Sequence, residues 1–400
     1  MTLPPAHVAG AGMIRFGKYP VDVTLERLAV GAARAAISDA GAELRHIDAL
    51  YVGHVFGGPV AGQRIAVQLG LDGLPVSNHE NYCASGATAI REAWVALAAG
   101  LHDVVLVIGV EKMTDRVAGG VRPDPSDLDA AVGLVMAAGH AMSARRYMHD
   151  HGVTREAIAA VAVKNHAHSV HNPFAQYQRP VRLEEVLAAR TIADPLGLLD
   201  CSPISDGAAA LVMCTPAGLR RLGLSGATPR ILGCGLVSGG VQDGSRPLND
   251  EDVSRRAGEA AWQLTGIGPS DVDIVEMHDC FTIAEIVRLE GLGLVPVGEG
   301  AHWTEQGHTA LGGKLPVNAS GGLLSRGHPV GATGVAQACE LTWQLRGSAG
   351  DANISQYAAA SSTNSSYQDG YGAGSLRDLS VDQNGVISGT FTNGQVLSLA

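Results

Sequence analysis

The sequence predicts an α/β protein in which one β/α unit occurs twice. Short apolar, β-branched runs alternate with Ala-rich stretches, which predicts a mostly parallel sheet with helices on its faces. Segments 83–90 and 328–335 share one pattern: each has Gly-Ala-Thr three residues after its first residue and continues into an Ala-rich helical stretch. The first residue of segment 83–90 is Cys83, and the first residue of segment 328–335 is His328. Upstream of these two segments, residues 47–56 also align with residues 272–281. We therefore expect two duplicated halves.

The elements of the first half follow in order along the chain. An Ala-rich amphipathic pattern predicts a helix over 25–41 that ends at Gly41. The other elements expected are a buried strand over 48–56, a helix over 83–99, and buried strands over 103–110 and 206–213.

Residues 116–200 interrupt this alternation. They contain Pro123-Asp124-Pro125, a helix starting near Thr154, and turns rich in His, Asn and Pro. We interpret them as an inserted loop domain that shapes a ligand pocket. The second copy starts near Arg230 and contains its own buried strand over 272–277. The expected domains are 1–225, which includes the loop domain 116–200, a truncated second half at 226–350, and a tail at 351–400.

The composition changes abruptly at about Asp351. The last fifty residues contain no Cys, His or Lys, and a single Arg, Arg377. Asn384-Gly385 and Asn393-Gly394 separate short alternating runs, which predicts a small β-meander. Because the helix-on-sheet pattern stops here, we expect the tail to lie outside both duplicated halves.

The bulk properties exclude several classes of protein. A formal net charge of −11 argues against a general nucleic-acid surface. The N-terminus lacks the basic and apolar blocks of a signal peptide, and the longest apolar run, 104–110, is too short to span a membrane. Six cysteines scattered over 400 residues do not form a disulfide framework. These observations predict a reduced, cytoplasmic protein without nucleic-acid or membrane partners.

Cys83 is the candidate nucleophile. A thiol at a helix N-terminus meets unsatisfied N–H groups and the positive end of the helix dipole, which favour the thiolate. The small residues Ser85, Gly86 and Ala87 leave room for a ligand. The alternative is a buried structural cysteine, the commoner role of a lone Cys. The equivalence of Cys83 with His328 favours the catalytic interpretation, since the duplication would bring a thiol and an imidazole together.

His328 is the candidate base. It follows a Gly-rich loop, and Pro329 suits the first position of a helix. A His here can take the thiol proton and later polarise a substrate carbonyl. The alternative, a His that caps a helix, does not explain its equivalence with Cys83.

His278 and Cys280 form a second His/Cys pair. They follow the expected strand 272–277, and functional groups in open α/β sheets gather at the carboxyl ends of strands. Cys280 could act as an acid/base thiol. The alternative is that Cys280 and Phe281 are core residues.

A metal site is not expected. His166, His168 and His171 are close in sequence, but their spacing follows the end of a helix, and no carboxylate or Cys clusters with them. Cys201 and Cys214 flank an Ala-rich strand and are expected to pack in the core.

Several motifs in order make the chain resemble the thiolase superfamily over residues 6–349. The matching motifs are Asn81-Tyr82-Cys83-Ala84-Ser85-Gly86, Gly109-Val110-Glu111-Lys112-Met113, Cys201-Ser202-Pro203-Ile204-Ser205-Asp206-Gly207, His278-Asp279-Cys280-Phe281, Asn318-Ala319-Ser320-Gly321-Gly322 and Gly327-His328-Pro329-Val330-Gly331-Ala332-Thr333-Gly334. The His-Asp-Cys-Phe motif is similar to that of sterol-carrier-protein-type and archaeal-type thiolases.

The resemblance implies a thiolase fold, with two βαβαβαββ halves and a loop domain. It implies acyl-CoA acyltransfer: Claisen condensation of acyl-CoA, or thiolytic cleavage of 3-oxoacyl-CoA. Cys83 would carry the acyl group, His328 would activate it, and His278 with His328 would line an oxyanion hole. A coenzyme A thioester is then the substrate and no cofactor is expected. A homodimer or homotetramer is expected, and the resemblance allows a small OB-fold partner protein.

The chain departs from the thiolase pattern at its C-terminal side. Thiolases end with two more strands and a Cys-x-Gly loop that supplies an acid/base thiol, whereas here no Cys follows Cys339. Residues 353–400 instead resemble the C-terminal part of a bacterial flagellar hook protein, so we expect a join near residues 347–351 and impaired activity. Two alternatives stay open: a thiolase-like carbon–carbon lyase acting on steroid or aryl side-chain CoA thioesters, and a non-catalytic acyl-CoA- or lipid-binding protein.

Overall fold

The protein is described here from a computed structural model. The structure describes residues 4–117, 119–121, 124, 126, 128–226, 228–239, 248–354, 376–381, 387–391 and 396–398. The chain divides into two compact units, Met1–Tyr357 and Ala358–Ala400. Among the described residues, no helix is both long enough and apolar enough to cross a membrane.

A six-stranded sheet forms the centre of the first unit. Its strand order is β3-β2-β4-β7-β1-β8. The strands are β1 (Ala6–Met13), β2 (Ala49–Gly53), β3 (Val76–His79), β4 (Val104–Lys112), β7 (Asp206–Cys214) and β8 (Arg230–Ile231). Every residue of β4 and β7 is buried, as expected for strands covered on both faces.

The sheet is mixed, so the prediction of a mostly parallel sheet was wrong. Strands β3, β2 and β4 run parallel to one another, whereas β7, β1 and β8 each pair antiparallel with their neighbours. The apolar runs at 103–110 and 206–213 are doubly buried, and a doubly buried strand has no alternation that distinguishes parallel from antiparallel pairing.

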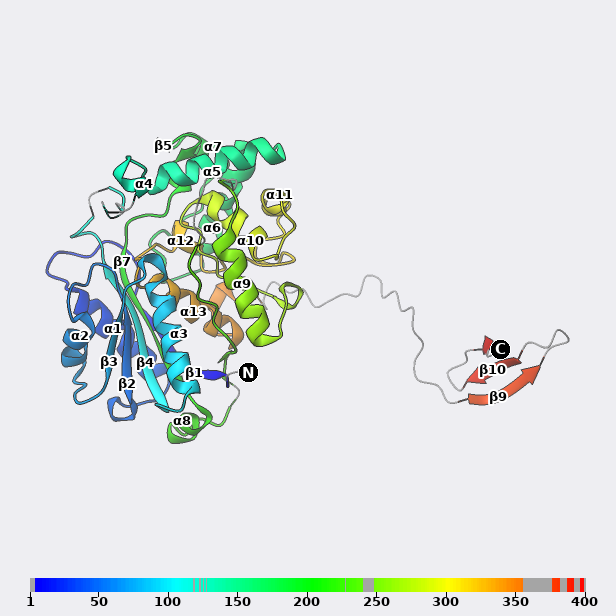
Figure 1. The fold of residues 1–400 in the computed structure, drawn as a ribbon, viewed down its shortest axis with the longest axis horizontal. Helices are drawn as coiled ribbons and strands as arrows, with labels where there is room; N and C mark the ends of the chain where they lie inside the picture. The colour runs from blue at the N-terminus through cyan, green and yellow to red at the C-terminus, as the bar shows by residue number, and fades with distance from the viewer. Residues whose placement is uncertain are drawn as a thin grey trace. The chain divides into compact units, whose positions relative to one another are not determined.

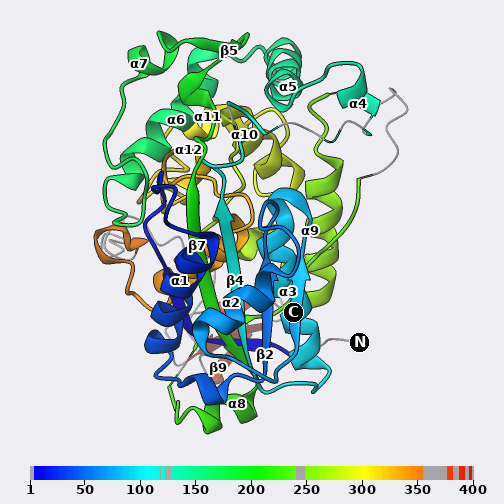
Figure 2. The same ribbon diagram turned by 90° about the vertical axis from the view of Figure 1, so that its left-hand side faces the viewer.

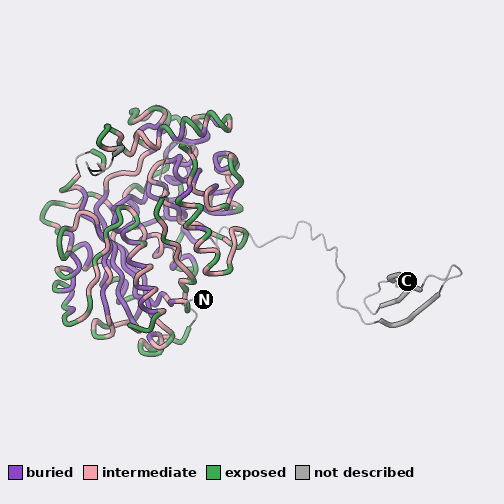
Figure 3. The backbone as a smooth tube through the Cα atoms, viewed as in Figure 1, coloured by how far each residue is buried: buried purple, intermediate pink, exposed green. Residues whose placement is uncertain are grey.

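Two helical layers cover the sheet. Helices α1 (Leu25–Asp39) and α2 (Ala61–Leu69) lie on one face, as Figures 1 and 2 show, and α3 (Ser85–Ala98) and α13 (Thr333–Leu345) lie on the other. Helix α8 (Pro216–Arg221) follows β7. The tube in Figure 3 shows that the strands of this sheet are mostly buried and that exposed backbone lies mainly on the outer helices and turns.

The inserted segment 116–200 forms helices of its own. These are α4 (Leu128–Ala131), α5 (Met136–His151), α6 (Arg155–Ser169) and α7 (Leu183–Leu187), and a short β5 (Thr191–Ala193) pairs with β6 (Leu196–Gly197). Its core residues pack with residues of α10 (Thr282–Gly291) and α12 (Gly322–Ser325) in one apolar cluster. The insertion is therefore anchored on the second half of the chain.

The second half is mainly helical in its described part. Besides α10, α12 and α13 it contains α9 (Asp252–Thr265) and α11 (Gly300–Glu305). The strand predicted over 272–277 is reduced to a single parallel bridge between Val275 and Val317. The side chain of Asn318 ends this pairing, because its Oδ1 accepts the Met277 N–H at 2.7 Å.

The two copies of the Gly-Ala-Thr motif pack against each other where α3 meets α13. A Cβ atom on Gly86 or on Gly109 would lie 2.6 Å from the Gly331 carbonyl oxygen, and one on Gly334 would lie 2.6 Å from the Ala87 nitrogen. Backbone therefore approaches backbone directly, which brings the two motifs together as their equivalence predicted.

The second unit contains the predicted β-meander. Strands β9 (Leu376–Val381), β10 (Ile387–Phe391) and β11 (Val396–Ser398) form an antiparallel sheet in the order β11-β10-β9. The Asn-Gly pairs predicted to turn between them lie outside the described residues. The resemblance to a hook protein and the domain limits 1–225, 226–350 and 351–400 stay predictions.

The glycine contact predicts a large cost for one added methyl group. Gly109→Ala places Cβ against Gly331 and Ala332 backbone atoms at 2.6 and 2.9 Å, so we expect a loss of about 1–3 kcal/mol in the free energy of unfolding. Urea unfolding followed by circular dichroism measures this. Gly226→Ala is the control, since its Cβ meets nothing within 4 Å. Equal midpoints for the two variants would contradict the argument.

Candidate active site

Cys83 lies in a 3-10 turn, Tyr82–Ala84, directly before α3. Tyr82 has a φ of 45°, in the left-handed region that side chains rarely adopt. The turn is fixed by Ser85, whose hydroxyl donates to the Tyr82 carbonyl at 2.6 Å and accepts the Asn81 N–H at 2.8 Å. The strained turn places the thiol at the N-terminal end of α3.

The electrostatics of Cys83 differ from the sequence-based expectation. We expected the helix end to favour the thiolate, but burial and the nearby negative charge of Cys280 raise the pKa of Cys83 to about 12, against the opposing effect of Arg288. In the resting protein Cys83 is therefore a thiol. It can attack only if a neighbouring base takes its proton.

His328 supplies a neutral imidazole beside this thiol. Its Nδ1 lies 2.7 Å from the Thr333 hydroxyl, and its backbone N–H donates to the Ser205 hydroxyl at 3.0 Å. Its Nε2 is buried and has no hydrogen-bond partner. Burial lowers the pKa of His328 to about 3, with a further contribution from His278, so the ring is neutral in the resting site.

His278 completes a compact group with Cys83 and His328. The Cys83 sulfur and one ring nitrogen of each His all lie within 4.8 Å of one another. The two imidazoles meet edge to face, with their ring centres 4.9 Å apart. The spacing of these three atoms is also compatible with a metal ion, but a closed tetrahedral site would need a fourth ligand.

Cys280 lies among three basic side chains. Its Sγ is 3.7 Å from His140 Nε2 and 3.7 Å from Arg288 Nη1. Burial alone would raise the pKa of Cys280, but Arg288, with His140 and His278, holds it well below its usual range. The two thiols of the site thus differ in charge: Cys83 is protonated and Cys280 favours the thiolate.

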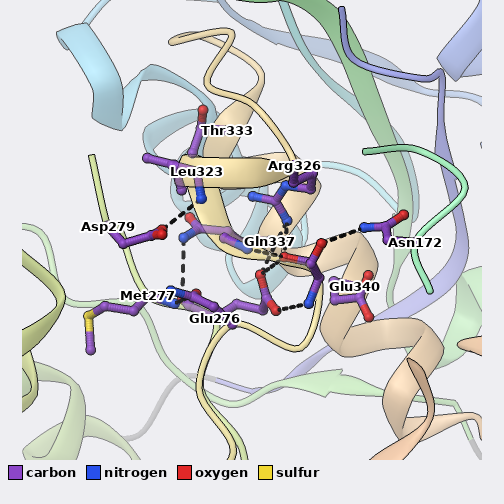
Figure 4. Close-up of polar contacts among 12 residues, drawn as sticks. Asn172, Glu276, Met277, Asp279, Leu323, Arg326, Thr333, Gln337 and Glu340 are labelled. Carbon is purple, nitrogen blue, oxygen red and sulfur yellow. Dashed lines mark hydrogen bonds and ion pairs between the residues drawn. The ribbon is translucent and has the colours of Figure 1, made fainter. Parts of the chain in front are cut away.

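A buried polar network holds the two histidine segments in place (Figure 4). Arg326 Nη1 lies 3.2 Å from Glu276 Oε2, and neither side chain is exposed. Ser320 donates its hydroxyl to the same carboxylate at 2.6 Å and its backbone N–H at 3.0 Å. Nearby, Asp279 accepts the Leu323 N–H at 2.7 Å. The segment that carries His278 is thereby tied to the loop that leads to His328.

Glu111 ties the same loop to the first half. Its buried carboxylate accepts N–H groups of Val55 and Phe56, both at 2.9 Å, and of Gly331 at 3.1 Å. Burial raises the pKa of Glu111 to about 7, against the effect of these three donors.

The structure thus gathers all four candidate residues, Cys83, His278, Cys280 and His328, around one site. Sequence reasoning missed two of their neighbours, His140 and Arg288. Arg288 was detectable as one of two charges, with Glu285, in the otherwise apolar helical stretch 283–289, whereas nothing in the sequence around His140 distinguishes it.

The other candidates have structural roles. His168 accepts the Leu311 N–H at its Nε2 and contacts the Asn318 carbonyl through Nδ1, so neither ring nitrogen is available to a metal. Cys201 donates to the Gly197 carbonyl, and Cys214 is buried in β7, as expected of packing residues.

Two family models match the chain. The thiolase N-terminal domain matches residues 6–217, and the thiolase C-terminal domain-like family matches residues 245–368. The second match extends beyond the predicted domain limit at residue 350.

Curated relatives agree with these models. An acetyl-CoA acetyltransferase of Methanothermobacter thermautotrophicus is 41% identical over 361 residues, which cover 87% of this chain and 92% of the relative. The benzoylsuccinyl-CoA thiolase subunit BbsB of Thauera aromatica is 38% identical over 344 residues, which cover 85% of this chain and 89% of the relative.

Solved structures share the fold. The Ltp2-ChsH2(DUF35) aldolase has a TM-score of 0.75 and 30% identity, covering 89% of this chain and 93% of the other. Human mitochondrial 3-ketoacyl-CoA thiolase has a TM-score of 0.68, covering 88% of this chain and 94% of the other. Its sequence identity of 20% means that this similarity supports the fold alone.

The buried network predicts a strong effect of Arg326→Met. The change leaves Glu276 as an uncompensated buried charge, so we expect a loss of about 3–5 kcal/mol in the free energy of unfolding, measured in urea. Adding Glu276→Gln should recover part of the loss. Arg45→Met, which removes an exposed ion pair with Glu43, is the control and should change stability far less. If the loss of stability in the double variant equals the sum of the losses in the two single variants, the two side chains do not act as a pair.

Proposed function

The chain belongs to the thiolase family of acyltransferases, and on that premise we propose that it transfers acyl groups between coenzyme A thioesters through an acyl-Cys83 intermediate. The observation that carries this proposal is the group formed by Cys83, His278 and His328, whose reactive atoms lie within 4.8 Å of one another. A thiol, a neutral base and a second imidazole are the parts that acyl transfer to cysteine requires.

The first step acylates Cys83. His328 takes the thiol proton at its unpartnered Nε2, and the resulting thiolate attacks the thioester carbonyl. The carbonyl oxygen becomes an oxyanion, which the His278 and His328 rings stabilise. The carbon–sulfur bond to coenzyme A then breaks, and the departing thiolate takes the proton that His328 holds. The raised pKa of Cys83 makes this proton transfer to His328 necessary.

The second step uses Cys280 as base. In condensation, the Cys280 thiolate removes a proton from the α-carbon of a second acyl-CoA, and the carbanion attacks the acyl-Cys83 carbonyl. Cys83 leaves as a thiolate, and the proton that Cys280 removed then passes to it, which restores Cys83 as a thiol and Cys280 as a thiolate. In the reverse direction, Cys280 returns the proton to the α-carbon while Cys83 attacks the 3-oxo group. Cys280 would thus take the acid/base role of the Cys-x-Gly loop that thiolases carry.

A carbon–carbon lyase is the competing activity, because the chain is 30% identical to the Ltp2-ChsH2(DUF35) aldolase. Retro-aldol cleavage needs no acyl-Cys83 intermediate, so trapping of that intermediate distinguishes the two reactions.

We also propose that the protein forms a homodimer and that it acts in the reducing environment of the cytoplasm. Strand β3 lies at an edge of the sheet, where a second copy could add its own strand. A site that works through two thiols needs a reducing environment. The name of the similar Ltp2-ChsH2(DUF35) aldolase joins two components, which motivates a search for a small partner protein of this chain.

Cys83→Ala should abolish the acyl-enzyme, and Cys83→Ser should leave little of it, because a hydroxyl is hard to ionise near neutral pH. Mass spectrometry of the intact protein after incubation with acetyl-CoA measures the adduct, and acetoacetyl-CoA thiolysis measures turnover. Cys234→Ala, which changes another half-buried thiol, is the control and should keep both acyl-enzyme formation and turnover.

Turnover in Cys83→Ala within about tenfold of the parent would show that Cys83 is not the nucleophile. Cleavage of a β-hydroxyacyl-CoA by Cys83→Ala at the parent rate would favour the lyase instead.

A further inference from the structure

We propose that His140, a residue of the inserted segment, is a positioning residue that takes the Cys280 proton and, with Arg288, keeps Cys280 as the base for the second step. This inference rests on the proposed function, because it specifies how Cys280 is prepared for its role. It adds to the site a residue from a part of the chain that carries neither the nucleophile nor the two catalytic histidines.

The orientation of the His140 ring is fixed. Its Nδ1 lies 3.0 Å from the Met136 carbonyl oxygen, one turn earlier on α5. A carbonyl can only accept, so Nδ1 carries a proton and donates it. The ring also stacks on Phe281, with centres 4.2 Å apart and planes 23° from parallel. Nε2 therefore faces Cys280 as the ring's remaining acceptor.

A proton between Cys280 and His140 then has two positions. With the proton on sulfur, Cys280 donates to Nε2 across 3.7 Å. With the proton on Nε2, the pair becomes a thiolate and an imidazolium, since Nδ1 keeps its own proton. Burial lowers the pKa of His140, but its contact with Cys280 outweighs this and raises it, in the direction that favours the charged pair.

Arg288 biases the pair toward the charged form. Its Nη1 lies 3.7 Å from Cys280 Sγ and also donates to the His278 carbonyl oxygen. Its Nε is 3.7 Å from Glu251, which keeps the guanidinium oriented. The other titratable groups that interact with Cys280 are His278, His328, Cys83 and Cys201. The His140 ring on α5 and the Arg288 guanidinium on α10 thus approach one sulfur.

His140 also connects the site to a surface cavity. It lines a cavity of about 380 Å³ together with Met136, Leu248 and Val287. His140 therefore contacts both Cys280 and a surface cavity, from which its imidazolium proton can exchange with solvent.

The test is the pH profile of Cys280 alkylation in the full-length protein. Iodoacetamide reacts with thiolates, and peptide mass spectrometry reports Cys280 and Cys83 separately. In the parent we expect Cys280 to react at a pH well below that at which an ordinary thiol does, while Cys83 reacts slowly and faster as pH rises. His140→Gln cannot take the proton, so the midpoint of its Cys280 profile should move up toward that of an ordinary thiol, and its Cys280 rate at pH 6.5 should fall by about tenfold.

Two further variants separate this role from a structural one. His140→Ala with added imidazole should recover Cys280 reactivity at pH 6.5, because free imidazole can occupy the vacated space and accept the proton. His149→Gln changes an exposed His of the same helix and should leave the profile as in the parent. Circular dichroism reports whether each variant is folded.

Acylation of Cys83 by acetyl-CoA is measured in the same samples. We expect His140→Gln to keep acyl-enzyme formation within about threefold while condensation falls at least tenfold. A Cys280 profile in His140→Gln that matches the parent would overturn the inference, as would absence of imidazole rescue in a folded His140→Ala protein. Absence of acyl-Cys83 in the parent would contradict the proposed function instead, whatever the Cys280 profile shows.

Discussion

The ion pair between Arg326 and Glu276 is the interaction on which the candidate site depends. Neither side chain is exposed, and both lie in the segments that lead to the two histidines of the site. Those segments have little regular secondary structure: around His278 the described pairing consists of two isolated bridges, at Val275 and Phe281, and residues 315–333 are buried without interruption in turns and short helices. Side-chain hydrogen bonds therefore replace the backbone ladder that would otherwise fix the two loops.

Such a network makes the site rigid at a cost in desolvation. A buried guanidinium and carboxylate gain most when their remaining hydrogen-bonding groups are satisfied. Ser320 provides both a hydroxyl and an N–H to the carboxylate, whereas Nε and Nη2 of Arg326 are buried without a hydrogen-bond partner. Rigidity matters because the imidazoles must stay within a few ångströms of a thiol that does not ionise by itself. The network thus links a stability feature directly to the chemistry proposed for Cys83.

The sequence predicted the fold class, most elements of the first half and the approach of the two Gly-Ala-Thr motifs. These came from repetition and periodicity, which are local properties of a chain. The direction of β7 was not predictable, because a doubly buried strand has the same pattern in either orientation. The expected strand at 272–277 failed because a side chain, Asn318, takes up a backbone donor there, and that contact spans forty-one residues.

The candidate site was predictable in part for a similar reason. Cys83, His278, Cys280 and His328 stand in distinctive short motifs, so their types and order were visible. The opposite charge states of the two thiols were not, because they arise from Arg288 and His140, which reach Cys280 from two different helices. A helix dipole argument considers only the residues next to a thiol in sequence, whereas burial and distant charges decide its ionisation.

The glycine contact between the halves has a consequence for the range of substrates. Cys83 belongs to the first half and Cys280 to the second, and backbone atoms of Gly86, Gly109 and Gly331 meet without side chains between them. Main-chain contact therefore sets the spacing of the two backbone segments that carry these sulfurs. The helices of the insertion lie outside this contact, so their surface can vary in shape without changing it. Apart from His140, the insertion could then diverge with substrate size while the spacing of the two catalytic segments stays the same.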